Sequence, residues 1–512
     1  MSPTKGKKKT HQQRIDASVN GIVKLQHEKK KETWRLQYHI TAPVSWINDP
    51  NGFSLFQDEY HLFYQFHPYS TEWNDMHWGH VKSSDLVHWE HLPPALAPSE
   101  EYDKDGCFSG SAISIENKLY LMYTGNVWTG PDPDKDLEQT QCLAVSTDGI
   151  HFSKLSDNPV IASAPTNADI HPYHFRDPKV WQKDGYYYAI LGSKTKDNIG
   201  QALLYRSTDL LSWEFISVAA RGRGNMGYMW ECPDLFHLDG QDVLVMSPQG
   251  VNPEGDNYQN LHQAVYAPGS LDLRKGTFDF DHFYPLDHGF DFYAPQTTVD
   301  RSGRRIVIGW MTMWESDMPE RKELWAGAMS LPRVLSFDND KWSILPLPEL
   351  DQLRGSKVEY KHILINGERN TLPGVNGNCI EMKVTIDPKK ASSCGIHFCA
   401  DEQLQEKTTL LFHNLEKKVT LDRSYSGEGP TGTRTTTLSN KHGLLHFHIF
   451  IDKSSVEIFM QHGEKVMSAR IYPKEASTGI AFFADGDIEL QHVEKWTLSK
   501  SINSSLPESH SN

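Results

Sequence analysis

The stretch DPKVWQKDGYYYAILGS, residues 177–193, is typical of a β-hairpin. Runs of aromatic and aliphatic residues stand on either side of Asp-Gly, which is the signature of two strands joined by a tight turn. Four other stretches share the pattern: NGFSLFQDEYHLFYQ (51–65), SGSAISIENKLYLMYTG (109–125), CPDLFHLDGQDVLVMSP (232–248) and APQTTVDRSGRRIVIGWM (294–311). Their turns recur at intervals of about 60 residues, which indicates an internal repeat.

A second signature keeps the same interval. It consists of SSDLVHW at 83–89, STDGIHF at 146–152 and STDLLSW at 207–213. Two independent patterns with one period predict radially repeated four-stranded sheets. Five repeats therefore predict an all-β protein with a five-bladed β-propeller, whose first strands line a central channel.

The rest of the chain has a different character. Beyond about residue 357, alternating strands such as HFHIFIDKSSVEIF lack the repeat and predict a C-terminal β-sandwich. The expected organisation is a basic, helical and solvated extension at 1–33, the propeller at 34–336, a linker at 337–356, the sandwich at 357–499 and a disordered tail at 500–512.

Composition narrows the partners and the compartment. With 51 basic and 66 acidic residues the net charge is −15, which disfavours nucleic acid or an anionic membrane as a partner. The first twenty residues hold no apolar stretch, so no secretory signal is expected, and no apolar run is long enough to span a bilayer. Six cysteines without a CxxC pair predict neither a disulfide scaffold nor a metal site. We expect a cytoplasmic protein, a monomer or homodimer, with a neutral small molecule as its partner.

Three acidic residues occupy similar places in the repeat. Asp49 in WINDPN, Asp177 in FRDPK and Glu231 in WECPD each precede a hairpin turn by about ten residues and stand close before a proline. The repeat predicts that these carboxylates converge at the channel mouth. Because like charges repel, at least one carboxyl is expected to hold its proton near neutrality, while Arg176 keeps a neighbour ionised. A protonated acid beside a carboxylate is what glycosidic cleavage needs.

Residue type suggests a division of labour. Glu231 reaches one methylene further than an aspartate, which suits proton delivery, and Asp49 on a tight turn suits a fixed nucleophile. The surroundings fit a sugar pocket, with polar groups at Asn48, Gln65, Ser109 and Arg176 and apolar faces at Trp46, Trp73, Trp78, Phe108, Trp230 and Trp314. Two alternatives remain open at this point, a calcium ion held by the three carboxylates and a metal site formed by His77, His80, His88 and His91.

Seven motifs in order identify the chain as a member of a known family. WINDPNG, FYQ, FSGS, FRDPK, WECPD, FYAPQ and SSVEIF resemble the series of glycoside hydrolase family 32, the invertases or β-fructofuranosidases. The resemblance extends over about residues 34–497. It is strongest to the bacterial intracellular branch, which hydrolyses sucrose or sucrose-6-phosphate.

The resemblance implies specific roles. Asp49 is implied as the nucleophile, Glu231 as the acid/base and Asp177 as the stabiliser that binds sugar hydroxyls, with retention of configuration through a fructosyl-enzyme and without cofactor or metal. Residues implied around the fructosyl unit are Asn48, Gln65, Trp73, Phe108, Ser109, Arg176 and Trp314, together with Trp46 and Ile47 of the first motif, where Ile47 replaces the usual Met. Fructosyl transfer, fructan exohydrolysis and sugar binding without turnover are the alternatives.

Overall fold

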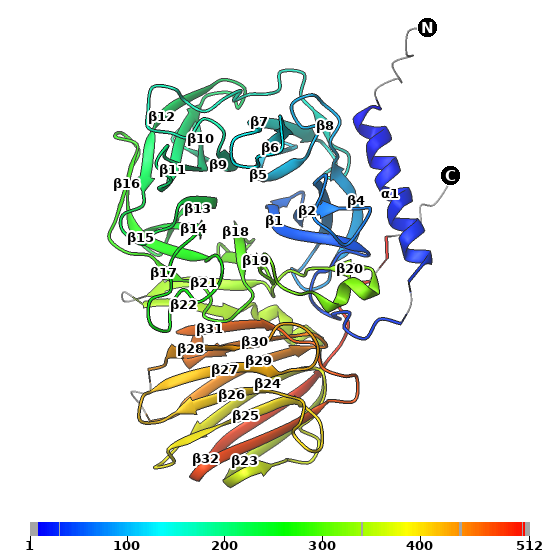
Figure 1. Cartoon of the computed structure of the whole chain (residues 1–512), viewed down its shortest axis with the longest axis vertical. Coiled ribbons are helices and arrows are strands. Elements are labelled where there is room, and N and C mark those ends of the chain that lie inside the picture. Colours follow the sequence, from blue (N-terminus) through cyan, green and yellow to red (C-terminus); the bar gives the residue numbers. More distant parts are fainter. Residues whose placement is uncertain (1–8, 30, 339–340, 440–442, 504, 507–512) are drawn as a thin grey trace.

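The computed structural model describes residues 9–29, 31–338, 341–439, 443–503 and 505–506. The propeller forms the upper body in Figure 1, the sheet domain lies beneath it, and helix α1 (His11–His27) runs along the side of the propeller. The predicted architecture, a five-bladed propeller followed by a β-sandwich, is confirmed.

Each blade is an antiparallel meander whose first two strands form a predicted hairpin. Blades 1 and 2 contain β1 (Ser45–Phe56), β2 (Glu59–His67), β3 (His77–Ser83), β4 (Glu90–Leu96), then β5 (Cys107–Ile115), β6 (Lys118–Trp128), β7 (Leu137–Ser146), β8 (Ser153–Lys154). Blade 3 contains β9 (Phe175–Lys183), β10 (Tyr186–Lys194), β11 (Gly200–Ser207), β12 (Trp213–Arg221). Blades 4 and 5 contain β13 (Met229–Leu238), β14 (Gln241–Gln249), β15 (Val265–Asp272), β16 (Thr277–Phe280), β17 (Tyr284–Pro285), then β18 (Tyr293–Val299), β19 (Arg305–Trp310), β21 (Arg333–Asp338), β22 (Lys341–Pro346).

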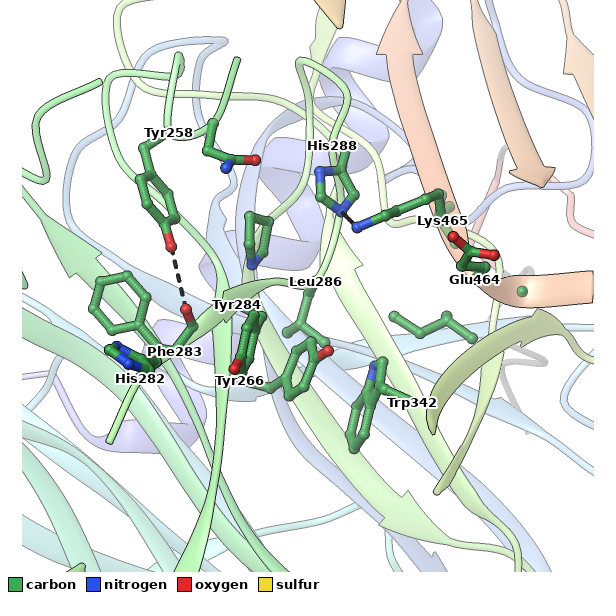
Figure 2. A pocket seen from close by; sticks show the side chains of 15 residues that line it. Tyr258, Tyr266, His282, Phe283, Tyr284, Leu286, His288, Trp342, Glu464 and Lys465 are labelled. Atoms are coloured by element: carbon green, nitrogen blue, oxygen red, sulfur yellow. Dashed lines mark hydrogen bonds between the residues drawn. The ribbon is translucent and has the colours of Figure 1, made fainter. Parts of the chain in front are cut away.

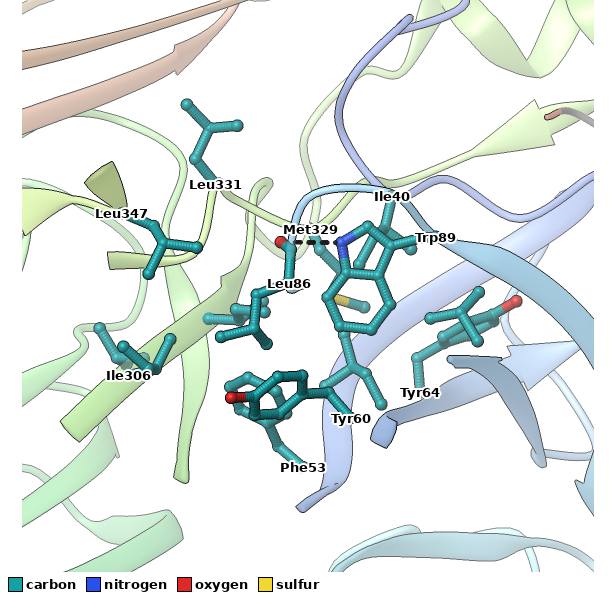
Figure 3. Close-up of a cluster of buried hydrophobic side chains, with 14 of the residues drawn as sticks. Ile40, Phe53, Tyr60, Tyr64, Leu86, Trp89, Ile306, Met329, Leu331 and Leu347 are labelled. Carbon is teal, nitrogen blue, oxygen red and sulfur yellow. Dashed lines mark hydrogen bonds between the residues drawn. The ribbon is translucent and has the colours of Figure 1, made fainter. Parts of the chain in front are cut away.

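The ring closes between blades 5 and 1. A short strand from the fifth blade, β20 (Trp325–Ala326), pairs in parallel with the start of β1. Below this junction an apolar cluster fills the wedge between the two blades, with Tyr60 and Trp89 from blade 1 facing Ile306 from blade 5 (Figure 3). Burial of this cluster, together with the β20 pairing, joins the ends of the repeat without leaving an open edge at β1.

The C-terminal domain is a sandwich whose two layers share one pair of long strands. Its strands are β23 (Arg354–Asn370), β24 (Cys379–Asp387), β25 (Ser393–Ala400), β26 (Lys407–His413), β27 (Lys418–Tyr425), β28 (Thr433–Thr437), β29 (Leu445–Asp452), β30 (Ser455–Met460), β31 (Lys465–Arg470) and β32 (Gly479–Leu498). The first half of β32 pairs with β25 and the second half with β24, so β32 passes from one layer to the other. Side chains of both layers form the core between them.

The observed bounds differ from the expected ones in two places. The stretch 337–356 contains β22, the outer strand of blade 5, followed by the short helix η2 (Pro348–Leu353), because alternating apolar residues pair this segment with β21. In the expected tail, Ile502 is buried and forms a bridge with Trp89, whose cluster it completes. Residues 1–8, 30, 504 and 507–512 of the expected extension and tail lie outside the described residues. Helix α1 is not fully solvated, since its Ile15 and Ile22 are buried.

Buried charges join the two domains. Arg333 of β21 and Glu457 of β30 form an ion pair of 2.5 Å in which both side chains are inaccessible to solvent. His39 lies between Glu457 and Asp452, at 2.9 and 2.8 Å. Because an unpaired charge in such a place is strongly unfavourable, these contacts define how the domains dock.

A cavity of about 360 Å³ opens at the seam between the domains (Figure 2). Tyr266 and Trp342 stack there with ring centroids 4.2 Å apart, and Tyr284 and Lys465 also line it. None of the predicted site residues contributes to this cavity. Among the described helices, none has the length and apolar character needed to cross a bilayer.

Candidate active site

The inner strands of the five blades contact one another in a ring, and each has a bulge near the same place. In blade 3, Arg176 pairs with Gly192 and Lys179 with Ile190, so one extra residue is accommodated between them. The same irregularity occurs between Ile47 and Pro50, Phe108 and Gly110, Glu231 and Asp234, and Tyr293 and Gln296. A proline cannot donate a ladder hydrogen bond and is tolerated at a bulge, which explains Pro50, Pro178, Pro233 and Pro295 in the four proline-containing motifs.

The bulges place site residues at two successive positions. Arg176, Glu231 and Tyr293 are each the last paired residue before the bulge in blades 3, 4 and 5. Asp177, Cys232 and Ala294 follow with positive φ angles of 61°, 48° and 48°. Glu231 is therefore equivalent to Arg176 and lies one position before the equivalent of Asp177, a one-residue difference from the predicted alignment. Because the backbone turns at the residue with positive φ, the two consecutive side chains of each bulge point in different directions within the channel.

Glu231 is held by three donors. Arg176 donates from Nη2 to Oε1 at 2.8 Å, while Tyr293 Oη and Gln249 Nε2 donate to Oε2 at 2.5 and 2.9 Å. Although burial acts to raise the pKa of Glu231, Arg176 and Tyr293 outweigh it and lower that pKa. Arg176 thus performs the predicted role of keeping a neighbouring carboxylate ionised.

Asp49 is oriented through both carboxylate oxygens. Ser109 Oγ donates to Oδ2 at 2.7 Å, and Asn48 Nδ2 donates to Oδ1 at 3.1 Å. Asn48 is itself positioned by Trp46, whose indole Nε1 donates to Asn48 Oδ1 at 2.8 Å. Burial, followed by the charge of Glu231, raises the pKa of Asp49.

Asp177 is the third carboxyl of the site, and its pKa is also raised. The Cys232 amide donates to its Oδ2 at 3.0 Å. Burial is the largest cause that raises the Asp177 pKa, to about 7, and the charges of Glu231 and Asp49 add to it against the opposing effect of Arg176. The Cys232 thiol lies 3.6 Å from Asp49 Oδ2 and 3.7 Å from Asp177 Oδ2, so these two acids meet at one place, and Arg176 links Asp177 to Glu231.

An aromatic wall borders the acids. Trp46 stacks on Trp314 with centroids 6.0 Å apart, and Trp73 meets the edges of Phe108 and Trp314 at 5.8 and 6.4 Å. Trp73 is 37% exposed, whereas Trp46 is only 3% exposed. The wall offers the apolar surface that a sugar ring face can cover.

Several predicted pocket residues have other surroundings. Ile47 is fully buried in the core between blades, and Trp78 and Trp230 are likewise inaccessible, so none of these three can face a ligand. Gln65 is buried, and its side-chain amide donates to the backbone carbonyl of Cys107 at 2.9 Å. In the sequence, apolar bulk or proximity to a motif does not distinguish a residue that packs in the core from one that binds a ligand.

Sequence reasoning did not select Tyr293, Gln249 or Cys232. FYAPQ was recognised as a repeat motif, and aligning its proline with those of WECPD and FRDPK would have put Tyr293 in register with Glu231. The contact of Gln249 comes from a neighbouring strand and has no signal of its own in the sequence.

The histidines considered for a metal make separate contacts. His80 Nε2 lies 2.9 Å from His61 Nδ1, and His77 Nδ1 lies 2.7 Å from the Asp75 carbonyl. His88 instead pairs with Asp85. In the part of the chain that the structure describes, the clusters with metal-like spacing are Asp134, His171, His174 and Glu359, His492, Glu494.

Comparison with known proteins agrees with this geometry. Residues 39–348 match the model for the glycosyl hydrolases family 32 N-terminal domain, and residues 349–497 match the family 32 C-terminal domain. A sucrose-6-phosphate hydrolase of Escherichia coli is 42% identical over 95% of this chain and 99% of its own length. The solved structure of the Bombyx mori GH32 beta-fructofuranosidase BmSUC1 superposes with a TM-score of 0.85 and 36% identity, covering 96% of this chain and 100% of that one. A mutant of that enzyme, solved in complex with sucrose, gives a TM-score of 0.83 at 35% identity, over 96% of this chain and 99% of its own.

A propeller whose axis carries three carboxylates and an aromatic wall defines the class as a glycoside hydrolase. The chain belongs to glycosyl hydrolase family 32.

Proposed function

We propose that this protein is a β-fructofuranosidase that hydrolyses sucrose to fructose and glucose with retention of configuration. One observation carries the proposal, the clustering of the three acids beside an aromatic wall: Asp49 and Asp177 share the Cys232 thiol, and Asp177 and Glu231 share Arg176. The names of the E. coli and Bombyx mori relatives and the sucrose complex of the latter support the same substrate class.

In the first step Asp49 attacks the anomeric carbon of the fructosyl unit. The bond from that carbon to the bridging oxygen breaks, and Glu231 gives its proton to this oxygen so that glucose leaves neutral. Ser109 and Asn48 hold the Asp49 carboxylate in one orientation, which lowers the entropic barrier to attack. The product of this step is a fructosyl ester on Asp49.

In the second step the Glu231 carboxylate takes a proton from water. The resulting oxygen nucleophile attacks the same carbon, the ester bond breaks, and Asp49 is released as a carboxylate. Asp177, when ionised, accepts hydrogen bonds from the sugar hydroxyls and supports the positive charge of the oxocarbenium-like transition state. Two inversions at one carbon give net retention.

The protonation of the site fits this cycle. The acids interact closely, so the proton is shared among the trio, and Asp177, whose pKa is raised to about 7, favours its protonated form below neutrality. When a sugar displaces water from Glu231, desolvation favours the neutral form of that carboxyl. Substrate binding therefore moves Glu231 toward the protonated state that the first step requires.

The roles are tested by Asp49→Ala and Glu231→Gln, assayed on sucrose by release of glucose. Loss of either group is expected to lower kcat by at least about 10³-fold, as removal of a nucleophile or acid does. Asp184→Asn, in the exposed turn of the β9–β10 hairpin, is the matched control and should retain full activity. Near-normal rates in both site variants would refute the assignment.

The glucose unit of the substrate could also carry a 6-phosphate. The guanidinium of Arg321 lies 5.4 Å from the Trp46 ring and donates to Glu72 at 3.1 Å, which places a cation at the aromatic wall. Comparing kcat/KM for sucrose and sucrose-6-phosphate in wild type and Arg321→Gln separates the substrates. Selective loss on the phosphorylated sugar would assign Arg321 to the phosphate.

Hydrolysis is favoured over fructosyl transfer by the hydrolase names of the relatives. Product analysis at high sucrose tests this, because oligomers would indicate transfer.

We also propose a cytoplasmic location, which is supported by six cysteines that are all free, and a monomer or homodimer as the assembly. Cell fractionation and light scattering test these two statements.

A further inference from the structure

His174 stands directly before β9 and contacts residues of two different blades. On one side its Nδ1 lies 3.2 Å from Arg176 Nη1. On the other side its Nε2 lies 3.0 Å from both the carbonyl oxygen and Oδ1 of Asp134, in the loop between β6 and β7. The His174 side chain is 10% exposed, so its contact with Arg176 is largely sheltered from water, whereas the Asp134 side chain is 51% exposed.

The chemistry of the partners fixes the state of this ring. A guanidinium can only donate, so Nδ1 of His174 must accept, and its proton must be on Nε2, which donates to Asp134. Burial, followed by the charges of Arg176 and Lys194, lowers the His174 pKa to about 3. The ring is therefore a neutral acceptor for Arg176 throughout the working pH range.

Asp134 is anchored in turn. Lys194, the last residue of β10, donates from Nζ to Asp134 Oδ1 at 2.5 Å, and the lysine side chain is 4% exposed. Charges thus alternate along a line from Lys194 through Asp134, neutral His174 and Arg176 to Glu231. Asp134, His171 and His174 have metal-like spacing, but Lys194 already contacts Asp134 Oδ1 and Arg176 contacts His174 Nδ1. These two cations favour a hydrogen-bonded relay over a bound metal.

We propose that His174 and Asp134 are positioning residues that hold the Arg176 guanidinium against Glu231. Arg176 reaches Glu231 through Nε and Nη2, at 3.3 and 2.8 Å, which leaves Nη1 for His174. With both edges of the guanidinium engaged, rotation away from Glu231 would break contacts on both sides. This inference rests on the roles proposed above for Glu231 and Asp49.

The consequence is a defined effect on the pH dependence of catalysis. The titratable and charged groups facing Glu231 are Arg176, Asp177, Asp49, Tyr293, Tyr228, Cys232 and His262. Those facing His174 are Arg176, Lys194, Asp134 and His171. Loss of the acceptor atom Nδ1 of His174 removes a hydrogen bond of Arg176 and of no other group that faces Glu231. Since Arg176 favours the ionised form of Glu231, the basic limb of the kcat/KM profile should then move to higher pH.

Three substitutions at His174 separate the relay from simple packing. His174→Asn puts an amide oxygen near the Nδ1 position and keeps the acceptor for Arg176, whereas His174→Gln places its amide near Nε2 and keeps only the contact with Asp134. His174→Ala removes both. The matched control is His151→Ala, because His151 makes a similar 2.8 Å contact with Asp148 but is 75% exposed on a blade edge.

On sucrose we expect His174→Ala to lower kcat roughly tenfold or more, as small misplacements of catalytic groups do, and to move the basic limb upward. His174→Gln should behave like His174→Ala, and His174→Asn should recover to within about threefold of wild type. His151→Ala should match wild type. Thermal unfolding of each variant is recorded alongside.

Other outcomes overturn the inference. A wild-type pH profile and kcat in His174→Ala, with or without a lower Tm, would make His174 merely structural. Equal losses in His174→Asn and His174→Ala would show that the acceptor is not what matters. Failure of the proposed function is separate, because it would appear as activity retained in Asp49→Ala and Glu231→Gln.

Discussion

Tyr293 donates its phenolic proton to Glu231 Oε2 across 2.5 Å, and the two residues hold equivalent positions on blades 5 and 4. Arg176 occupies the same position on blade 3 and approaches Glu231 from the other side. Three consecutive blades thus supply one acid and two of its donors from a single position of the repeat. The acidity of Glu231 is therefore a property of the ring of blades.

Tyr293→Phe should lower kcat on sucrose by about tenfold and move the basic limb of the kcat/KM profile to higher pH. The substitution removes one donor to the ionised form of Glu231, so its pKa rises, while the ring that packs beside His262 remains. Tyr284→Phe, in the seam cavity, is the control and should leave the profile unchanged. A profile identical to wild type in Tyr293→Phe would refute the role of this hydrogen bond.

Asp177→Asn should lower kcat by at least about 10²-fold. The same substitution should stabilise the fold at high pH. The Asp177 pKa is raised to about 7 in the folded protein, so the fold favours the protonated form. Stability from this group is greatest below its unfolded pKa of about 4 and falls as pH rises to 7. At pH 8 the neutral amide avoids the buried charge, and we expect Tm to exceed that of wild type by roughly 1–3 °C.

The difference in Tm between Asp177→Asn and wild type should be smaller at pH 5 than at pH 8, because wild-type Asp177 is protonated at pH 5. Differential scanning calorimetry at the two pH values measures it. A lower Tm than wild type at pH 8 would contradict the inferred protonation.

Trp73→Ala should raise KM for sucrose by about tenfold and change kcat less. Trp73 is 37% exposed and touches the wall only through ring edges, so its loss removes sugar-facing surface without opening the core. Initial rates over a range of sucrose concentrations separate the two parameters. Tyr425→Ala, on the exposed surface of the sandwich, serves as the control, and an unchanged KM in Trp73→Ala would remove Trp73 from the site.

Glu457→Gln should destabilise the protein by about 3 kcal/mol in denaturant unfolding. The carboxylate accepts from Arg333, His39 and the Leu331 amide, and the neutral amide leaves the buried Arg333 charge poorly compensated. Activity of the folded fraction at 25 °C should persist, since these contacts lie at the domain interface. Glu359→Gln, whose partners lie on the sandwich surface, should unfold like wild type. Equal stability of the two variants would show that the interface pair is not important.

The sequence was sufficient for the architecture because the fold depends on local patterns that repeat. Alternating apolar residues and turn signals mark each hairpin, and their common interval defines five blades. The boundary near residue 337 was misplaced because residues 341–346 become an outer strand only through their pairing with β21, and Ile502 pairs with Trp89 only once both are brought together in space.

For the site, the sequence by itself indicated the three acids, aromatic residues of the wall and the prolines that mark four of the five bulges. Only the tertiary structure decided the register of Glu231 with Arg176 and Tyr293, the burial of Ile47, and the raised pKa of Asp177. The physical reason is that a pKa and a hydrogen-bond partner depend on neighbours and on exclusion of water. In this ring those neighbours lie on different blades, about 60 residues apart in the chain.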